Sequence, residues 1–134
     1  MLGALERIGN LCLRIAKLVD DQPLLRSHPS VFVVIEELAE NVRLRFRTVH
    51  GAWSSGELAA LDRLDDTDPL EAFAGPLVER ILELEGDDAV RVAMAAFVAG
   101  RSLDRMGDHS NVMAARLRYL VTGDPTHLAE EVGS

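Results

Sequence analysis

The chain has 134 residues, of which 48% are hydrophobic and 4% aromatic, and its formal net charge is −8. A chain of this length can bury a core as one ordinary domain, and its aliphatic character favours packed helices over an aromatic-rich β-sandwich. The acidic balance argues against a nucleic-acid partner, which needs a basic face, and against adsorption to anionic membranes.

Two helices are expected in the first part of the chain. Hydrophobic residues three or four apart predict the first helix over about residues 2–19, with Pro23 beyond its end. The second helix is expected over about residues 29–53, where Pro29 suits the first helical turn. The first apolar stripe consists of Leu2, Leu5, Ile8, Cys12, Ile15 and Val19, and the second of Val31, Ile35, Leu38, Val42, Phe46, Val49 and Trp53.

The third helix is expected to be broken into two segments, because two capping boxes lie close together. Ser54 to Glu57 has the spacing of the first box and can open a segment through Leu64. Asp68 to Glu71 forms the second box, with proline at the first helical position, and opens a segment through Leu84. A kink is expected in that segment at Gly75 and Pro76.

The last helix has the clearest pattern, and Asp87 is expected to cap it. Hydrophobic and small residues alternate spacings of three and four from Ala89 to Leu120, which is a heptad seam suited to bundle packing. Gly123 and Pro125 stop this helix, and residues 126–134 are expected to form a flexible tail. The predicted fold class is all-α, an antiparallel helical bundle.

The sequence also indicates a cellular compartment. No apolar run approaches the length of a membrane span, and Glu6 and Arg7 interrupt the N-terminus, so no signal peptide is predicted. The single cysteine, Cys12, cannot form an internal disulfide and is interpreted as a small core residue in a reducing compartment. We therefore expect a cytoplasmic protein without direct membrane insertion.

A six-residue motif occurs twice. Residues 5–10 read Leu-Glu-Arg-Ile-Gly-Asn, and residues 103–108 read Leu-Asp-Arg-Met-Gly-Asp. The two copies agree position by position in chemical type, except that Asn10 stands where the second copy has Asp108. A repeat at this separation indicates two similar supersecondary units, each carrying one copy.

The repeated motif resembles the signature of the PhoU family, the cytoplasmic regulators of phosphate uptake. In that family it lies on the last helix of each of two tandem three-helix units, and residues 118–124 also look like the family's C-terminus. The resemblance implies that residues 1–22 are the end of a first unit and residues 23–125 a whole second unit. As partners it implies the ATPase of the phosphate ABC transporter and a phosphate-sensing histidine kinase.

Two carboxylates of the second motif copy are candidate metal ligands. Asp104 and Asp108 are four residues apart and share one helix face, where a hard cation would relieve their mutual repulsion. The natural second donor is the acidic cluster Asp62, Asp65 and Asp66 on the preceding segment. PhoU-like proteins hold iron or related metals with such a pairing, so the resemblance implies a transition metal, iron or manganese. The alternative is that these acids form a solvated face.

The sequence gives little support to catalysis. A di-iron oxidase needs Glu-x-x-His on two helices, and neither that pattern nor a glycine-rich phosphate loop is present. We therefore expect a non-enzymatic regulator, with a degenerate dimerisation or interaction module without metal as the alternative. A homo-oligomer is expected in either case, because the apolar stripe of the first helix lacks the earlier helices of its unit.

Overall fold

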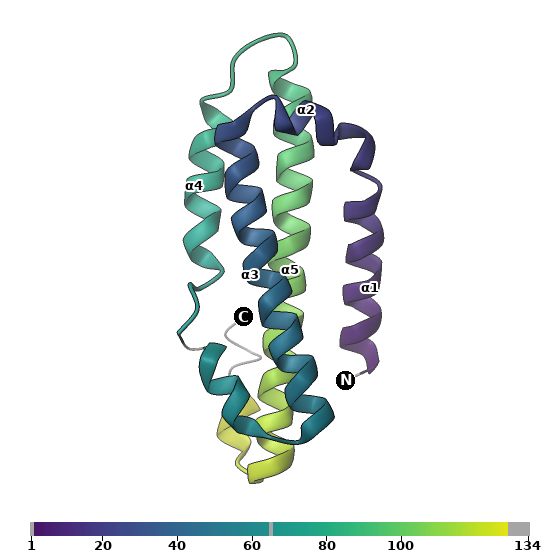
Figure 1. The fold of residues 1–134 in the computed structure, drawn as a ribbon, viewed down its shortest axis with the longest axis vertical. Helices are drawn as coiled ribbons and strands as arrows, with labels where there is room; N and C mark the ends of the chain where they lie inside the picture. The colour runs from purple at the N-terminus through teal and green to yellow at the C-terminus, as the bar shows by residue number, and fades with distance from the viewer. Residues whose placement is uncertain (1, 65, 129–134) are drawn as a thin grey trace.

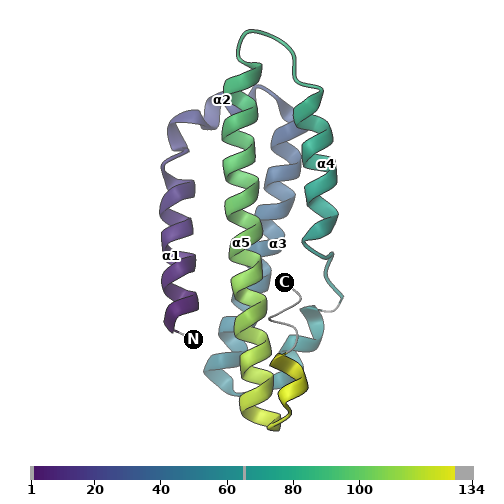
Figure 2. The ribbon, with the colours of Figure 1, turned by 180° about the vertical axis from the view of Figure 1, so that it is seen from behind.

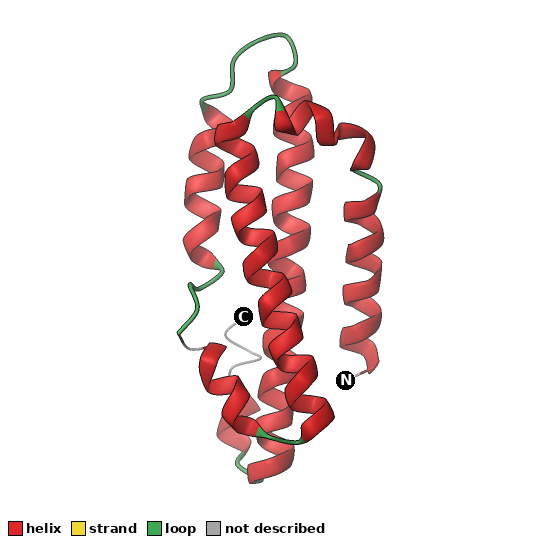
Figure 3. Ribbon diagram, viewed as in Figure 1, coloured by secondary structure: helices red, strands yellow, loops and turns green. Residues whose placement is uncertain are grey.

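The protein is a bundle of helices in the computed structural model, which describes residues 2–64 and 66–128. This part of the chain contains no strand (Figure 3), which confirms the all-α fold class. The four longer helices are α1 (Leu2–Ala16), α3 (Pro29–Ser55), α4 (Glu71–Leu82) and α5 (Ala89–Thr122), and the short elements are η1 (Val19–Asp21), α2 (Gln22–Arg26), η2 (Leu58–Leu64) and η3 (Pro125–Leu128).

The two longest helices, α3 and α5, form the centre of the bundle (Figure 1). Both run in the same direction, while α1 and α4 run opposite to them, so long helices that follow one another in the chain are antiparallel. Helix α4 packs on both α3 and α5, and α1 packs mainly on α5 (Figure 2). The arrangement is a three-helix unit of α3, α4 and α5, with α1 added along one side.

The core forms two clusters along the α3–α5 axis. The first lies between α2, α3, α4 and the N-terminal half of α5, where Ala95, Ala96 and Ala99 are buried. The second lies between α1, η2 and the C-terminal halves of α3 and α5, around Leu61 and Met113. The predicted stripe of the second helix is confirmed at five positions, since Val31, Ile35, Leu38, Val42 and Val49 are all buried.

The first predicted capping box was wrong. Ser54 lies inside α3, where its Oγ donates a hydrogen bond of 3.0 Å to the carbonyl oxygen of His50. The helix ends one residue later, at Ser55, because Gly56 takes a left-handed φ of 74°, which glycine adopts without steric cost. The next element, η2, is a 3₁₀ helix and not the start of a third α-helix.

The other two predicted caps were also wrong. Helix α4 has Leu70 at its N-cap, and the backbone carbonyl of Asp68 accepts hydrogen bonds from Asn41 and Arg45. Helix α5 has Asp88 at its N-cap in place of Asp87, and no side-chain capping bond forms there. The carboxylate of Asp88 instead accepts a hydrogen bond of 3.0 Å from Nε2 of His28.

The first helix is shorter than predicted and is rotated. It buries Ala4, Ile8 and Leu11 against the bundle, while Leu2 is 80% exposed. Cys12 is exposed, so its interpretation as a core residue was wrong. Two overlapping stripes satisfy helical spacing in this segment, and contact with α5 selects the one through Ala4. Of the expected flexible tail, residues 126–128 belong to η3, and residues 129–134 lie outside the described residues.

Two glycines of α5 allow α4 to approach closely. A Cβ built on Gly107 would lie 2.6 Å from Cδ1 of Leu70, and one on Gly100 would overlap Cδ2 of Leu77. Both leucines are buried, and each pair is separated by seven residues along its own helix or segment. The Gly107 of the second motif copy is therefore a packing position that determines where α4 begins.

We predict opposite effects for alanine at the glycine of each motif copy. Gly107→Ala should lower the free energy of unfolding by about 1 kcal/mol, because overpacking costs about 1–3 kcal/mol and the gain in helix propensity returns about 0.5–1 kcal/mol. A methyl group on Gly9 would meet no other atom within 4 Å. Gly9→Ala should therefore raise stability by about 0.5–1 kcal/mol. Urea unfolding monitored by circular dichroism measures both, and a stabilised Gly107→Ala would contradict the packing role.

Candidate functional site

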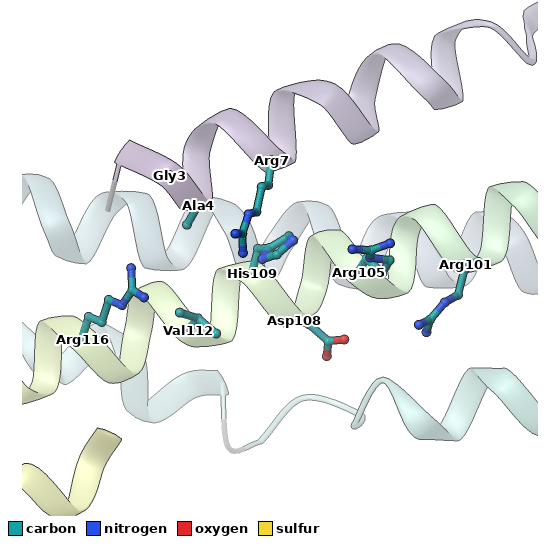
Figure 4. A pocket seen from close by; sticks show the side chains of 9 residues that line it. All are labelled: Gly3, Ala4, Arg7, Arg101, Arg105, Asp108, His109, Val112 and Arg116. Atoms are coloured by element: carbon teal, nitrogen blue, oxygen red, sulfur yellow. The ribbon is translucent and has the colours of Figure 1, made fainter. Parts of the chain in front are cut away.

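The two motif copies lie side by side, because α1 packs antiparallel on α5. Arg7 and Arg105 occupy the same position in the two copies, and both line a cavity of about 590 Å³ between these helices (Figure 4). Two motif copies that are far apart in the sequence therefore contribute to the same cavity. Its chemical character is set by arginines and not by the carboxylates that the sequence pointed to.

The cavity is strongly basic. Arg101, Arg116 and His109 of α5 line it together with Arg7 and Arg105. The partly buried imidazole of His109 has a lowered pKa, first because burial disfavours its charged form and then because the guanidinium groups of Arg7 and Arg105 repel a further positive charge. In Figure 4 the side chain of Arg7 reaches from α1 toward His109.

One carboxylate, Asp108, also lines this cavity. Its side chain points away from α1 and toward the segment on the other side of α5 (Figure 4). Its pKa is raised, first by burial and then by the negative charges of Asp104 and Glu71. The positive charges of Arg101 and Arg105 lower this pKa and so oppose part of the shift. Asp104 is itself paired with Arg101 at 3.2 Å. The predicted proximity of Asp104 and Asp108 is therefore confirmed, although one of them already has a cationic partner.

Of the other proposed metal ligands, two lie among the described residues. Asp62 and Asp66 are exposed, and Asp65 lies outside the described residues. In the residues that are described, no group of three His, Cys, Asp or Glu side chains could hold a metal ion. The acid that the electrostatics place near Asp108 is Glu71, at the start of α4.

The position of η2 places Asp62 toward the C-terminal end of α5. Nη2 of Arg118 donates a hydrogen bond of 3.3 Å to the backbone carbonyl of Leu61, so η2 lies beside the last turns of α5. Arg118 is ten residues beyond Asp108, which corresponds to about 15 Å along an α-helix. Metal binding by Asp104 and Asp108, with the acids near η2 as further ligands, stays a prediction.

Sequence reasoning missed Arg45, a buried charge beside the carboxylates. It is 6% exposed and lies in α3, between the buried residues Val42 and Val49. Its spacing of three and four from these two residues was the available signal, because it places the arginine on the buried stripe.

The guanidinium of Arg45 holds the connection before α4. Its Nη1 donates a hydrogen bond of 3.0 Å to Oδ1 of Asn111 in α5. Its Nη2 donates to the side chain of Thr67 at 3.2 Å and to the backbone carbonyl of Asp68 at 3.1 Å. Burial lowers the pKa of Arg45, while the charges of Glu71 and Asp108 oppose that shift. One positive group thus ties α3, α5 and the η2–α4 connection together and offsets the nearby acids.

No protein-family model matches the chain, and no curated protein or solved structure has significant similarity to it. In the part of the chain that the structure describes, every helix is too short or too polar to cross a lipid bilayer.

We predict that Arg45→Ala is strongly destabilising. Each buried acceptor that loses its donor costs about 1–3 kcal/mol, so the free energy of unfolding should fall by at least about 2 kcal/mol. Arg43, two residues earlier on α3, is exposed and paired with Glu40 at 2.6 Å. Arg43→Ala should cost much less stability than Arg45→Ala, because exposed ion pairs contribute little. Equal losses in chemical denaturation of the two variants would contradict the role assigned to Arg45.

A second prediction concerns pH. The raised pKa of Asp108 means that its ionised form destabilises the folded state, so the penalty is present above the folded pKa and vanishes below the ordinary value of 3.8. Asp108→Asn should therefore melt at a higher temperature than the wild type at pH 7, and the difference should disappear as the pH falls toward 3. The exposed change Asp62→Asn removes the same charge and should show no such gain. Thermal melts in buffers with EDTA measure this, and a destabilised Asp108→Asn at pH 7 would contradict it.

Proposed function

We propose that the chain is a PhoU-like regulator of phosphate uptake and phosphate signalling, which works in the cytoplasm through contacts with other proteins and not as an enzyme. The observation that carries the proposal is the apposition of the two motif copies on α1 and α5. Each motif copy lies on a helix that the resemblance makes the last of its unit, and the packing of α1 on α5 brings these two helices together. The three-helix unit of α3, α4 and α5 supports the same reading.

A surface suited to protein partners lies on the N-terminal half of α5. Val90, Met94, Phe97 and Val98 are 73%, 67%, 59% and 36% exposed, and their spacing places them along one stripe, here called the outer face of α5. This half of α5 faces the viewer in Figure 2 and has no helix in front of it. A contiguous exposed apolar stripe of this kind is typical of a surface for association. The ATPase of a phosphate transporter and a phosphate-sensing histidine kinase are the proposed partners.

The proposal predicts a defect in cells that make the protein naturally. Deletion of its gene should leave the rate of phosphate uptake unresponsive to the phosphate supply, and the wild-type gene should restore the response. The double change Met94→Glu and Phe97→Glu should fail to restore it, because two charges on the outer face of α5 oppose burial against a partner. Leu2→Glu with Leu13→Glu on the exposed side of α1 is the matched control and should restore the response.

Uptake of labelled phosphate, with protein levels checked by immunoblot, measures these outcomes. A deletion that leaves the phosphate response unchanged would contradict the regulatory function. The alternative, a dimerisation module, is favoured by the same apolar stripe. Sedimentation of the wild type and of the Met94→Glu and Phe97→Glu variant tests whether this stripe forms a homodimer. The phosphate response decides between the two functions, because a dimerisation module alone leaves that response unchanged.

A further inference from the structure

In the cavity between α1 and α5, two positively charged side chains have no ion pair with the rest of the described fold. Arg101 has an ion pair with Asp104, but Arg7 and Arg105 make no ion pair or hydrogen bond to any described residue. Both guanidinium groups nevertheless act on the same neighbour, since each lowers the pKa of His109. The two like charges of Arg7 and Arg105, brought together by two different helices, repel one another and weaken the α1–α5 contact.

This concentration of positive charge contrasts with the acidic net charge of the chain. The formal net charge is −8, with 14 lysines and arginines against 22 acidic residues, yet four arginines line this one cavity. An acidic protein repels small anions at long range, so a basic cavity on it selects ligands that can make close contacts with the arginines. The repulsion between Arg7 and Arg105 is relieved when such a ligand lies between them.

We propose that the cavity between α1 and α5 is a binding site for a small molecule carrying two or more phosphate-type negative charges, held between Arg7 and Arg105. His109 and Arg116 line the same cavity and can contact a ligand bound there. This site goes beyond the regulatory role proposed above and does not depend on it.

The chemistry of the side chains favours phosphate groups over other anions. The planar guanidinium presents parallel N–H donors that match two oxygens of a phosphate group, and one arginine on each side can bind one such group. Two arginines that make no ion pair or hydrogen bond to the described residues match a ligand with at least two charges. A cavity of about 590 Å³ is also larger than a single inorganic phosphate requires, and lies within the usual range for small-molecule sites.

The carboxylate of Asp108 does not oppose this arrangement directly. It lines the same cavity, but its side chain points away from α1, whereas the side chain of Arg7 extends from α1 toward His109 (Figure 4). The corresponding residue of the first motif copy is Asn10, which carries no charge. The cavity is therefore lined by an arginine from each motif copy and by a carboxylate from only the second, which leaves it basic.

Isothermal titration calorimetry of the untagged protein with inorganic phosphate, tripolyphosphate and citrate tests the proposal. Tripolyphosphate should bind at one site per chain and at least about tenfold more tightly than inorganic phosphate. Citrate, which has a similar charge but carboxylate groups, should bind more weakly than tripolyphosphate. Tripolyphosphate should also raise the melting temperature of the wild type. Citrate binding as tightly as tripolyphosphate would overturn the phosphate specificity.

A matched pair of double variants separates the cavity from general charge. Arg7→Gln with Arg105→Gln should weaken tripolyphosphate binding at least about tenfold, while Arg14→Gln with Arg47→Gln removes the same charge outside the cavity and should change it less than about twofold. All four arginines are exposed, and circular dichroism melts verify that each variant folds. Arg7→Lys with Arg105→Lys keeps the charge without the planar donors and should bind with intermediate affinity.

Three results would overturn the proposal. One is the absence of tripolyphosphate binding by the folded wild type at low ionic strength. Another is an equal loss of affinity in the two glutamine double variants, which would indicate attraction by net charge alone. The third is full affinity in Arg7→Gln with Arg105→Gln, which would place the ligand elsewhere.

Discussion

The hydrogen bonds of the buried Arg45 are the interaction on which the functional half of the bundle depends. By holding Thr67 and the carbonyl of Asp68, the guanidinium fixes the connection between η2 and α4 against α3 and α5. That connection places Leu70 against Gly107, and it places Glu71 near enough to Asp108 for its charge to raise the pKa of Asp108. A positive group inside the bundle also makes it possible for two carboxylates to be partly buried on the same face of α5.

The two motif copies share a sequence pattern but have different physical surroundings. The glycine of the second copy lies under a leucine of another segment, whereas the glycine of the first copy has open space around it. The acid at the end of the second copy is partly buried among other charges, and the first copy has an amide there. Only the arginines, Arg7 and Arg105, share one location, because antiparallel packing places both of them at the same cavity. Repetition in sequence therefore does not imply repetition of the site.

Periodicity predicted the helices well where a long helix has one dominant apolar stripe, as in α3 and α5. It predicted α1 poorly, because Ala4 is as acceptable in a tight interface as Leu2, and only the neighbouring helix decides which of them is buried. The predicted caps failed because Asp68 and Ser54 make other hydrogen bonds that depend on residues far away in the sequence or inside the helix. The basic cavity could not be predicted, since its arginines come from helices whose contact no local pattern specifies.

The exposure of Cys12 has a practical consequence. It is the single cysteine of the chain and lies on the solvent side of α1. A fluorescent or spin label attached to this thiol therefore needs no engineered cysteine and does not disturb the residues that α1 buries. Because α1 is held mainly through α5, the mobility of such a label would report directly on whether the N-terminal helix stays docked when the protein meets its ligands and partners.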